Sequence, residues 1–130
     1  MDKGTQTNIG HEISADMRNC IQECQRCHNI CLETIMHCLR MGGEHAEPEH
    51  IRLLMDCAEI CQTSANFMLR MSELHGLTCD VCAEICERFA RDCDRFVDDT
   101  MMQACAQTCR SCAESCRQMA ASAPPPPAGD

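Results

Sequence analysis

The chain has 130 residues, a formal net charge of −9 and fifteen cysteines, but only three phenylalanines and no tyrosine or tryptophan. This length is typical of one domain that can bury its own core. The acidic charge disfavours nucleic acid and anionic membranes as partners, and no apolar stretch is long enough to cross a membrane. With so few aromatic residues, the thiols, or something bound to them, must contribute to the interior.

Such a high cysteine content usually indicates a secreted framework of disulfides. Three features argue against that interpretation here. The chain opens with Met1, Asp2, Lys3 and Gly4 and continues with polar residues, without the apolar segment of a secretion signal. The cysteine count is odd, and most cysteines lie three or four positions apart, where Cβ atoms on a helix are about 5–6 Å apart, against about 3.8 Å in a disulfide. We therefore expect a cytoplasmic protein whose thiols are free or metal-bound.

Composition divides the chain into three segments. Residues 1–9 are polar and are predicted to be a disordered N-terminus. Residues 10–121 are predicted to form one helical domain. Residues 122–130 contain four consecutive prolines and are predicted to be a disordered tail.

The first helix should begin between Asn8 and Ser14 and end near Met41, where Gly42 and Gly43 follow. Its cysteines and apolar residues are spaced alternately three and four positions apart, which places them on one inward stripe of a helix. The residues of this stripe are Ile13, Met17, Cys20, Cys24, Cys27, Cys31, Thr34, Cys38 and Met41.

A second helix is predicted from Pro48 to about His75, because proline suits the first position of a helix and Gly76 suits its end. The third helix should be capped by Thr78, and the fourth by the turn at residues 98–100. The inward residues are His50, Leu54, Cys57, Cys61, Ser64, Met68, Met71 and His75 on the second helix, Cys79, Cys82, Cys86, Phe89, Cys93 and Phe96 on the third, and Met102, Cys105, Cys109, Cys112, Cys116 and Met119 on the fourth.

The four helices repeat one pattern. Each contains two cysteines four positions apart, and the cysteines of the first helix match those of the third in spacing. The matched positions are Cys24, Cys27, Cys31 and Cys38 with Cys79, Cys82, Cys86 and Cys93. The chain therefore reads as a duplicated helical hairpin. Two short-looped hairpins with inward stripes predict an all-α, antiparallel four-helix bundle with a Cys-lined core.

A buried cysteine is often no more than a small apolar side chain. Inert packing does not explain rows of cysteines on all four helices, because leucine and isoleucine pack better and do not oxidise. Rows of thiolates that face one another form a channel of soft ligands, which favours Cu(I), zinc or iron–sulfur clusters. All fifteen cysteines are therefore candidate metal ligands.

The arrangement of the thiols ranks these metals. Zinc prefers closed tetrahedral sites, and fifteen thiolates could fill at most three of them. Iron–sulfur clusters usually take their cysteines from loops, whereas these cysteines lie along helices. Cu(I) accepts two or three sulfur ligands, so shared thiolates could hold roughly one ion per cysteine along the channel. We therefore expect multiple Cu(I) ions per chain.

These motifs resemble the bacterial copper storage proteins, in particular their cytosolic branch. The resemblance covers about residues 10–120 and rests on the CxxxC pairs of all four helices and on the absence of a signal segment. It implies storage of many Cu(I) ions by cysteine thiolates inside a four-helix bundle, and assembly into a homotetramer. This chain departs from the family in having few cysteines on the second helix, where Ser64 and Met68 continue the stripe.

Methionine and histidine are candidates for copper uptake, because thioethers bind Cu(I) weakly and imidazole can assist. Met41, His50 and Met102 occupy inward positions near one end of the bundle and are predicted to serve there. At the same end, Met36, His37 and Met101 are expected to pack or to face solvent. His28 lies off the stripe and is expected at the surface or in a contact between chains.

At the opposite end, five residues are expected to close the core: Met17, Met68, Met71, His75 and Met119.

Two other functions remain open from the sequence. One is sequestration of zinc or of heavy metals in general, and the other is a redox or iron–sulfur protein. We expect no enzyme, because no nucleophile–base pair with an orienting group is apparent. The sequence does not identify a delivery partner, whether a copper chaperone or an efflux protein.

Overall fold

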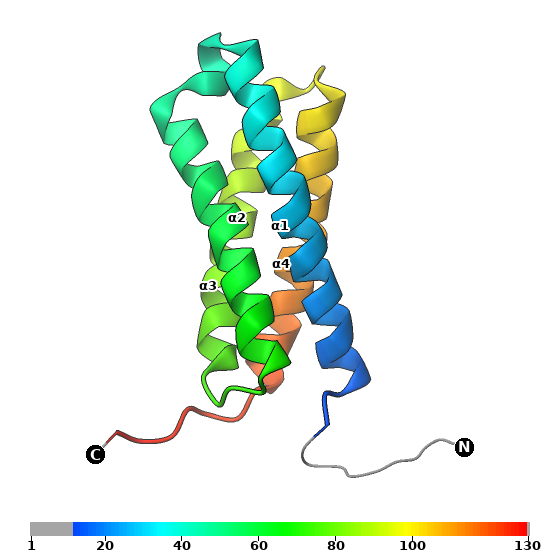
Figure 1. Cartoon of the computed structure of the whole chain (residues 1–130), viewed down its shortest axis with the longest axis vertical. Coiled ribbons are helices and arrows are strands. Elements are labelled where there is room, and N and C mark those ends of the chain that lie inside the picture. Colours follow the sequence, from blue (N-terminus) through cyan, green and yellow to red (C-terminus); the bar gives the residue numbers. More distant parts are fainter. Residues whose placement is uncertain (1–11, 130) are drawn as a thin grey trace.

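A computed structural model of the chain describes residues 12–129 (Figure 1). Long helices dominate these residues, and short 3₁₀ helices lie in two of the connections. The prediction of a disordered segment at residues 1–9 lies outside the described residues. The elements are α1 (Ala15–Met41), η3 (Gly43–Ala46), α2 (Pro48–Leu69), α3 (His75–Asp92), η4 (Cys93–Phe96) and α4 (Thr100–Ser122).

Local sequence signals set most of the helix ends. The Ser14 hydroxyl accepts a hydrogen bond from the Met17 amide and caps α1, at one limit of the range predicted for its start. Gly42 follows the last residue of α1 with a φ of 71°, a left-handed conformation that favours glycine. Pro48 is the first residue of α2, and Asp99 caps α4, both as predicted.

The turn between α2 and α3 lies earlier in the chain than predicted. α2 ends at Leu69 rather than near His75, and Met71 in the turn has a φ of 53°. α3 begins at His75. Thr78, the predicted cap, instead lies within α3, where its hydroxyl donates to the His75 carbonyl at 3.0 Å. The inward spacing continues through this turn, so periodicity alone did not reveal the break.

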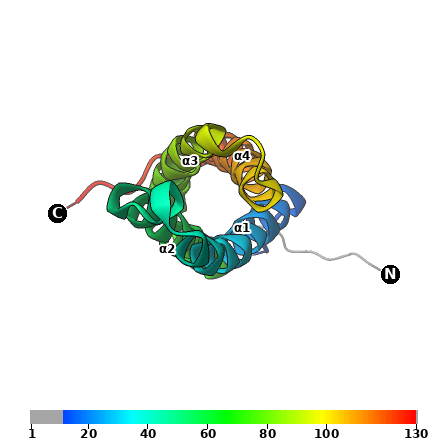
Figure 2. The same cartoon turned by 90° about the horizontal axis from the view of Figure 1, so that it is seen from above.

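The helices form a closed ring. Each helix packs against the next one in the chain, and α1 also packs against α4. Viewed along the bundle, the four helices surround one common interior (Figure 2). Successive helices run in opposite directions, so the prediction of an all-α, antiparallel four-helix bundle is confirmed.

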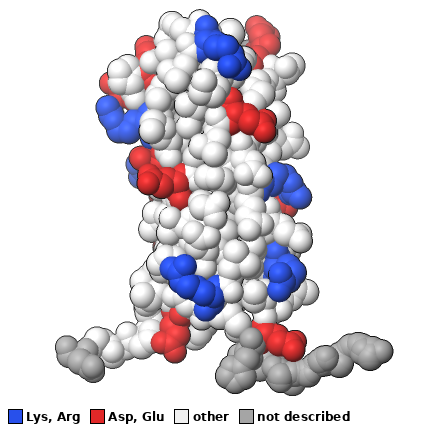
Figure 3. Space-filling view, viewed as in Figure 1, with Lys and Arg blue, Asp and Glu red and all other residues white. Residues whose placement is uncertain are grey.

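Sulfur fills most of this interior. All fifteen cysteines lie in the described part of the chain, and each has a relative exposure of 0 %. The charged side chains are scattered over the outer surface, as the visible face shows (Figure 3). None of the described helices combines the length and hydropathy that a membrane span requires.

The C-terminal segment leaves the bundle at the end of α4. Residues 123–129 contain no helix or strand. The chain passes close to α3 as it leaves, because a Cβ atom added at Gly76 would lie only 2.9 Å from the Cβ of Ala123. Glycine at position 76 therefore makes room for the start of the tail.

Candidate metal centre

The core thiols form one continuous network. Neighbouring sulfur atoms within it are 3.5–4.0 Å apart, and contacts link all four helices. Cys79 joins at one end, where it groups with Cys20 and Cys116. We call this set the thiol core. Its members are Cys20, Cys24, Cys27, Cys31, Cys57, Cys61, Cys79, Cys82, Cys86, Cys105, Cys109, Cys112 and Cys116.

Groups of four thiols recur along the thiol core. In each group the four sulfur atoms all lie within 4.8 Å of one another. The groups overlap: Cys61, for example, belongs both to a group with Cys27 and to a group with Cys112. Ions bound in adjacent groups would therefore share ligands. This is the arrangement of a multinuclear thiolate site, not of separate closed sites.

The sulfur atoms are close but not bonded. Their separations of 3.5 Å or more far exceed the roughly 2.05 Å of a disulfide, and all fifteen cysteines are free. Burial raises the pKa of the Cys38 thiol to about 11 and also raises that of Cys93. Buried thiolates without a cation are costly, so a metal ion that enters must replace the thiol proton.

The end of the bundle at which α1 ends and α4 begins holds a second group of donors. We call this end the mouth. Cys38 Sγ lies 3.4 Å from His50 Nε2 and 3.6 Å from the Met102 sulfur. His50 is 1 % exposed and Met102 is fully buried, so both predicted uptake residues face the interior. The three donors converge and can hold one soft ion.

Asp92 holds His50 in place. The Nδ1 atom of His50 donates a hydrogen bond to Asp92 Oδ2 at 2.6 Å, and this bond directs Nε2 toward Cys38. The His50 ring also packs against Phe89 and Phe96, with ring centroids 5.3 and 5.1 Å apart. A carboxylate that fixes the far nitrogen of a histidine is a common outer partner at metal sites. The sequence alone did not point to Asp92.

A layer to which α1, α2 and α3 contribute no sulfur lies between the mouth and the thiol core, whereas on α4 the inward residues Met102 and Cys105 follow each other directly. Thr34, Leu54 and Phe89 are fully buried. On its own helix, each lies about one turn from a cysteine of the thiol core and about one turn from a cysteine or histidine nearer the mouth. The Thr34 hydroxyl donates to the Ile30 carbonyl at 2.7 Å, so it is already satisfied. No sulfur–sulfur contact within 4.0 Å crosses this layer among the described residues. Cys38 and Cys93 therefore lie on its outer side, apart from the thiol core.

Met41 does not lie where the inward stripe placed it. Its side chain is 56 % exposed, so the prediction that it faces the interior beside His50 and Met102 is wrong. Met41 is the last residue of α1, about one turn beyond Cys38. The residue instead lines a surface groove with His37 and His45.

The opposite end of the bundle contains apolar and weakly donating side chains. Met68 is fully buried, and its sulfur lies 3.8 Å from Cys79 Sγ. His75 and Met119 are each 8 % exposed, whereas Met17 and Met71 are only partly buried. Ser64 faces inward, at a level where the other helices have cysteine. Its hydroxyl donates a hydrogen bond to Cys79 Sγ at 3.5 Å.

His28 is partly exposed and lines a shallow pocket on the outer side of the bundle. Its Nδ1 atom lies 2.7 Å from the Ala58 carbonyl and joins α1 to α2. His37 was likewise expected only to pack or to face solvent, yet it and His45 both contact Asp99 Oδ2. The sequence had marked Asp99 as a helix cap, but gave no signal for these contacts.

A four-helix bundle whose interior is a continuous network of thiols defines a binder of soft metal ions. Comparison with known proteins identifies the family of metal binders. Residues 13–121 match the family described as Csp, copper storage protein. The chain belongs to this family.

Solved structures agree with this assignment. The Nmul_A1745 protein of Nitrosospira multiformis is 50 % identical, with a TM-score of 0.77 over 82 % of this chain and 95 % of that chain. Cu(I)-bound copper storage protein BsCsp3 is 35 % identical, with a TM-score of 0.75 over 81 % and 98 %. A cytosolic copper storage protein from Streptomyces lividans, with five coppers, is 29 % identical, with a TM-score of 0.72 over 82 % and 93 %.

One curated protein also matches. The cysteine-rich protein YhjQ of Bacillus subtilis, described as uncharacterised, is 37 % identical over 68 residues. The matched stretch spans 52 % of this chain and 63 % of that protein.

Proposed function

We propose that this chain stores and buffers multiple Cu(I) ions, bound by the thiolates that line the bundle. The observation that carries the proposal is the unbroken network of sulfur contacts from Cys20 to Cys105 across all four helices. Metal–thiolate bonds of about 2.3 Å place the sulfurs of a three-coordinate ion about 4 Å apart. Loading therefore requires little movement of the helices.

Loading with Cu(I) also avoids an excess of negative charge on the buried thiolates. Each Cu(I) ion that enters replaces about one proton, so the core stays near neutral while it fills. Binding adds contacts in the folded state alone, which supports a rise in stability with copper content. Cu(I), as multiple ions per chain, is thus the cargo of the bundle.

Copper enters through the mouth in this proposal. Cys38, His50 and Met102 provide a thiolate, an imidazole and a thioether that converge within 3.6 Å. Weak and mixed donors suit an ion that must move on. Met41 lies on the outer surface of the same end, so it would make first contact and not complete the buried site.

Catalysis is not part of the proposal. Cys38, His50 and Asp92 have the connectivity of a nucleophile, a base and an orienting carboxylate. Cys38, however, is fully buried and lies against the Met102 sulfur. A substrate carbonyl could not reach it.

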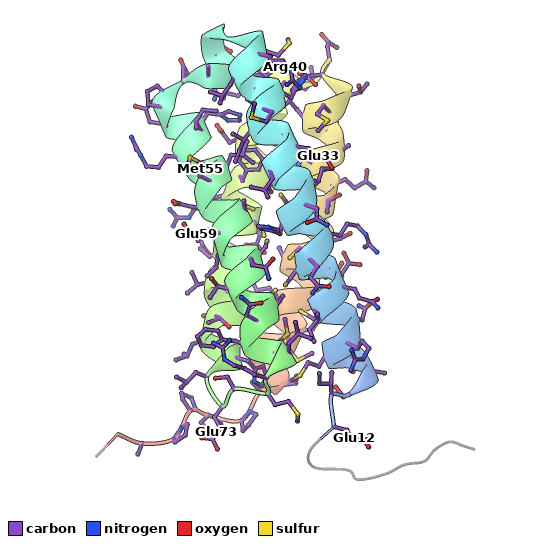
Figure 4. The ribbon with its side chains drawn as sticks, in the orientation of Figure 1. Glu12, Glu33, Arg40, Met55, Glu59 and Glu73 are labelled. Carbon is purple, nitrogen blue, oxygen red and sulfur yellow. The ribbon has the colours of Figure 1, made fainter. Side chains whose placement is uncertain are left out.

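We propose a cytoplasmic homo-oligomer, and a tetramer as the resemblance to the family implies; one similar protein is described as cytosolic, and exposed apolar side chains favour assembly. Leu32, Leu39 and Met55 on α1 and α2 are each about half exposed. Met55 projects outward from α2, as does Glu59 one turn further along (Figure 4). Apolar side chains gathered on one face suit contact with a second copy. Sedimentation of the reduced protein would measure the assembly directly.

Zinc storage is the competing function, because the four-thiol groups could each hold a tetrahedral ion. With fifteen cysteines in the chain, at most three zinc ions could each have four thiolates of their own. Anaerobic titrations with Cu(I) and Zn(II), run in parallel on the reduced protein, separate the two. Copper storage predicts many more Cu(I) than Zn(II) ions per chain; equal numbers near three favour zinc.

A further inference from the structure

A cluster of nitrogen and oxygen donors lies at the mouth, outside the thiol core. The Nε2 atoms of His37 and His45 lie 2.8 and 2.9 Å from one oxygen, Oδ2 of Asp99. His37 belongs to α1, His45 to η3, and Asp99 caps α4, so three elements meet at this atom. We propose that these three side chains bind one divalent ion of borderline softness, such as Zn(II) or Ni(II). The proposal goes beyond copper storage.

The donor set is chemically suited to such an ion. Imidazole binds zinc, nickel and iron well, and two imidazoles with one carboxylate leave positions open for water. Donor atoms bound to one ion at about 2.0–2.2 Å lie about 3 Å apart. The observed separations of 2.8 and 2.9 Å therefore require only small shifts. Each ring would carry its proton on Nδ1, and coordinate bonds would replace the two hydrogen bonds.

The three side chains are already oriented. Asp99 Oδ1 accepts hydrogen bonds from the Met101 and Met102 amides at 3.0 and 3.1 Å, which leaves Oδ2 to the histidines. The His45 ring packs on Phe96 with centroids 4.2 Å apart, and the His37 ring meets His45 edge-on at 5.8 Å. Fixed donors lose little freedom when an ion binds, which favours affinity.

An ion can reach the cluster from solvent. His37 and His45 line an open groove of about 500 Å³, and their side chains are 25 % and 15 % exposed. Arg95 also lines this groove, but its guanidinium is paired with Asp92 and Glu47. Asp98 adds a further carboxylate to the groove. The charges around the cluster therefore do not exclude a cation.

The proposed site of His37, His45 and Asp99 differs from the thiol core in its donor atoms and in the elements that a bound ion would connect. It contains no sulfur, so it is less selective for Cu(I) than the thiol core. His37 precedes Cys38 in the chain, and Asp99 caps the helix turn that carries Met102. An ion bound here would tie together the three elements that surround the uptake donors.

The test uses protein first saturated with Cu(I), so that the thiols are occupied. Calorimetric titration with Zn(II) should then show one equivalent per chain. Asp99→Asn and His45→Gln should each weaken this binding about 10-fold or more. Asparagine caps a helix as well as aspartate does, so Asp99→Asn removes the carboxylate and keeps the cap. Circular dichroism confirms that each variant is folded.

His28→Gln is the matched control, since His28 also lies on α1 but contacts only the Ala58 carbonyl. Its Zn(II) binding should equal that of the wild type. Unchanged Zn(II) affinity in both site variants, or no Zn(II) binding at all, would overturn the proposal. Co(II) added to the reduced protein gives a second test that does not depend on copper uptake. Weak visible bands lost in Asp99→Asn support the site, whereas only strong sulfur charge-transfer bands, equal in both proteins, contradict it.

Discussion

Cys24 and Cys116 are 92 positions apart in the chain, yet their sulfur atoms lie 3.5 Å from each other in the interior of the bundle. Cys24 belongs to α1 and Cys116 to α4. The duplicated hairpin closes into a ring only when these two helices meet, and this contact places both rows of thiols on the same interior. The fold and the metal site are thus one structure.

Replacing four central thiols should reduce capacity more than it reduces folding. Cys27, Cys31, Cys82 and Cys86 lie in the overlapping four-thiol groups. Serine at all four positions removes soft ligands and keeps side chains of similar size. We expect a loss of several Cu(I) ions per chain, with the helical circular dichroism spectrum of the metal-free protein largely kept. An unchanged copper count in this variant would show that the ions bind elsewhere.

Asp92→Asn should weaken the uptake site without altering the store. The amide cannot hold His50 as a carboxylate does, and loss of such a partner typically costs 10–100-fold in metal affinity. We expect the most weakly bound Cu(I) equivalent to lose about 10-fold or more in affinity, measured by competition with a Cu(I) chelator, while the affinity of the ions in the thiol core stays the same. Glu47→Gln is the control, because it removes the other carboxylate that contacts Arg95 and leaves His50 untouched. If Asp92→Asn and Glu47→Gln weakened Cu(I) binding equally, the lost affinity would be due to the altered contacts of Arg95 and not to His50.

Phe89 should slow the passage of copper from the mouth to the thiol core. Phe89→Ala opens the layer formed with Thr34 and Leu54, at a cost of about 3–5 kcal/mol in stability. Stopped-flow loading should show a slow phase in the wild type that becomes faster in this variant, with the same final copper number. Ile21→Ala controls for lost packing, because Ile21 is 2 % exposed and lies toward the opposite end. A slow phase that changes equally in both variants would mean that the layer is no barrier.

Asp99 should contribute stability that is lost in acid. Burial favours its neutral form, but hydrogen bonds from His37, the Met102 amide and His45 outweigh this and lower its pKa from 3.8 to about 2. A pKa lowered by folding adds stability above the unfolded value, and this stability disappears between about pH 4 and pH 2. Urea unfolding of the reduced, metal-free protein should show the wild type more stable than Asp99→Asn at pH 6, with the difference shrinking below pH 4. A difference independent of pH would contradict this role.

The inward positions were predictable because a helix repeats every 3.6 residues. The burial of Cys20, Cys57, Cys79 and Cys105 follows from spacing alone, and so does the ring of four helices. The limits appear where the chain stops being periodic. Met41 continues the stripe to the last residue of α1, where the side chain is exposed although its spacing is that of a buried residue.

The acidic partners of the histidines could not be predicted for a similar reason. Asp92 lies at the end of α3 and Asp99 in the following connection, 42 and 54 positions from His50 and His45. No periodic pattern relates residues at such positions. Their contacts depend on how the helix ends meet at the mouth, which is a property of the assembled bundle.

The central claim is that one chain stores many Cu(I) ions on its buried thiols. The most direct test is the number of Cu(I) ions bound per chain, measured by anaerobic titration of the fully reduced protein in competition with a chromophoric Cu(I) chelator. The account predicts saturation at roughly one ion per cysteine, on the order of 15. Saturation at about three ions or fewer, the number that separate tetrahedral sites could hold, would contradict it.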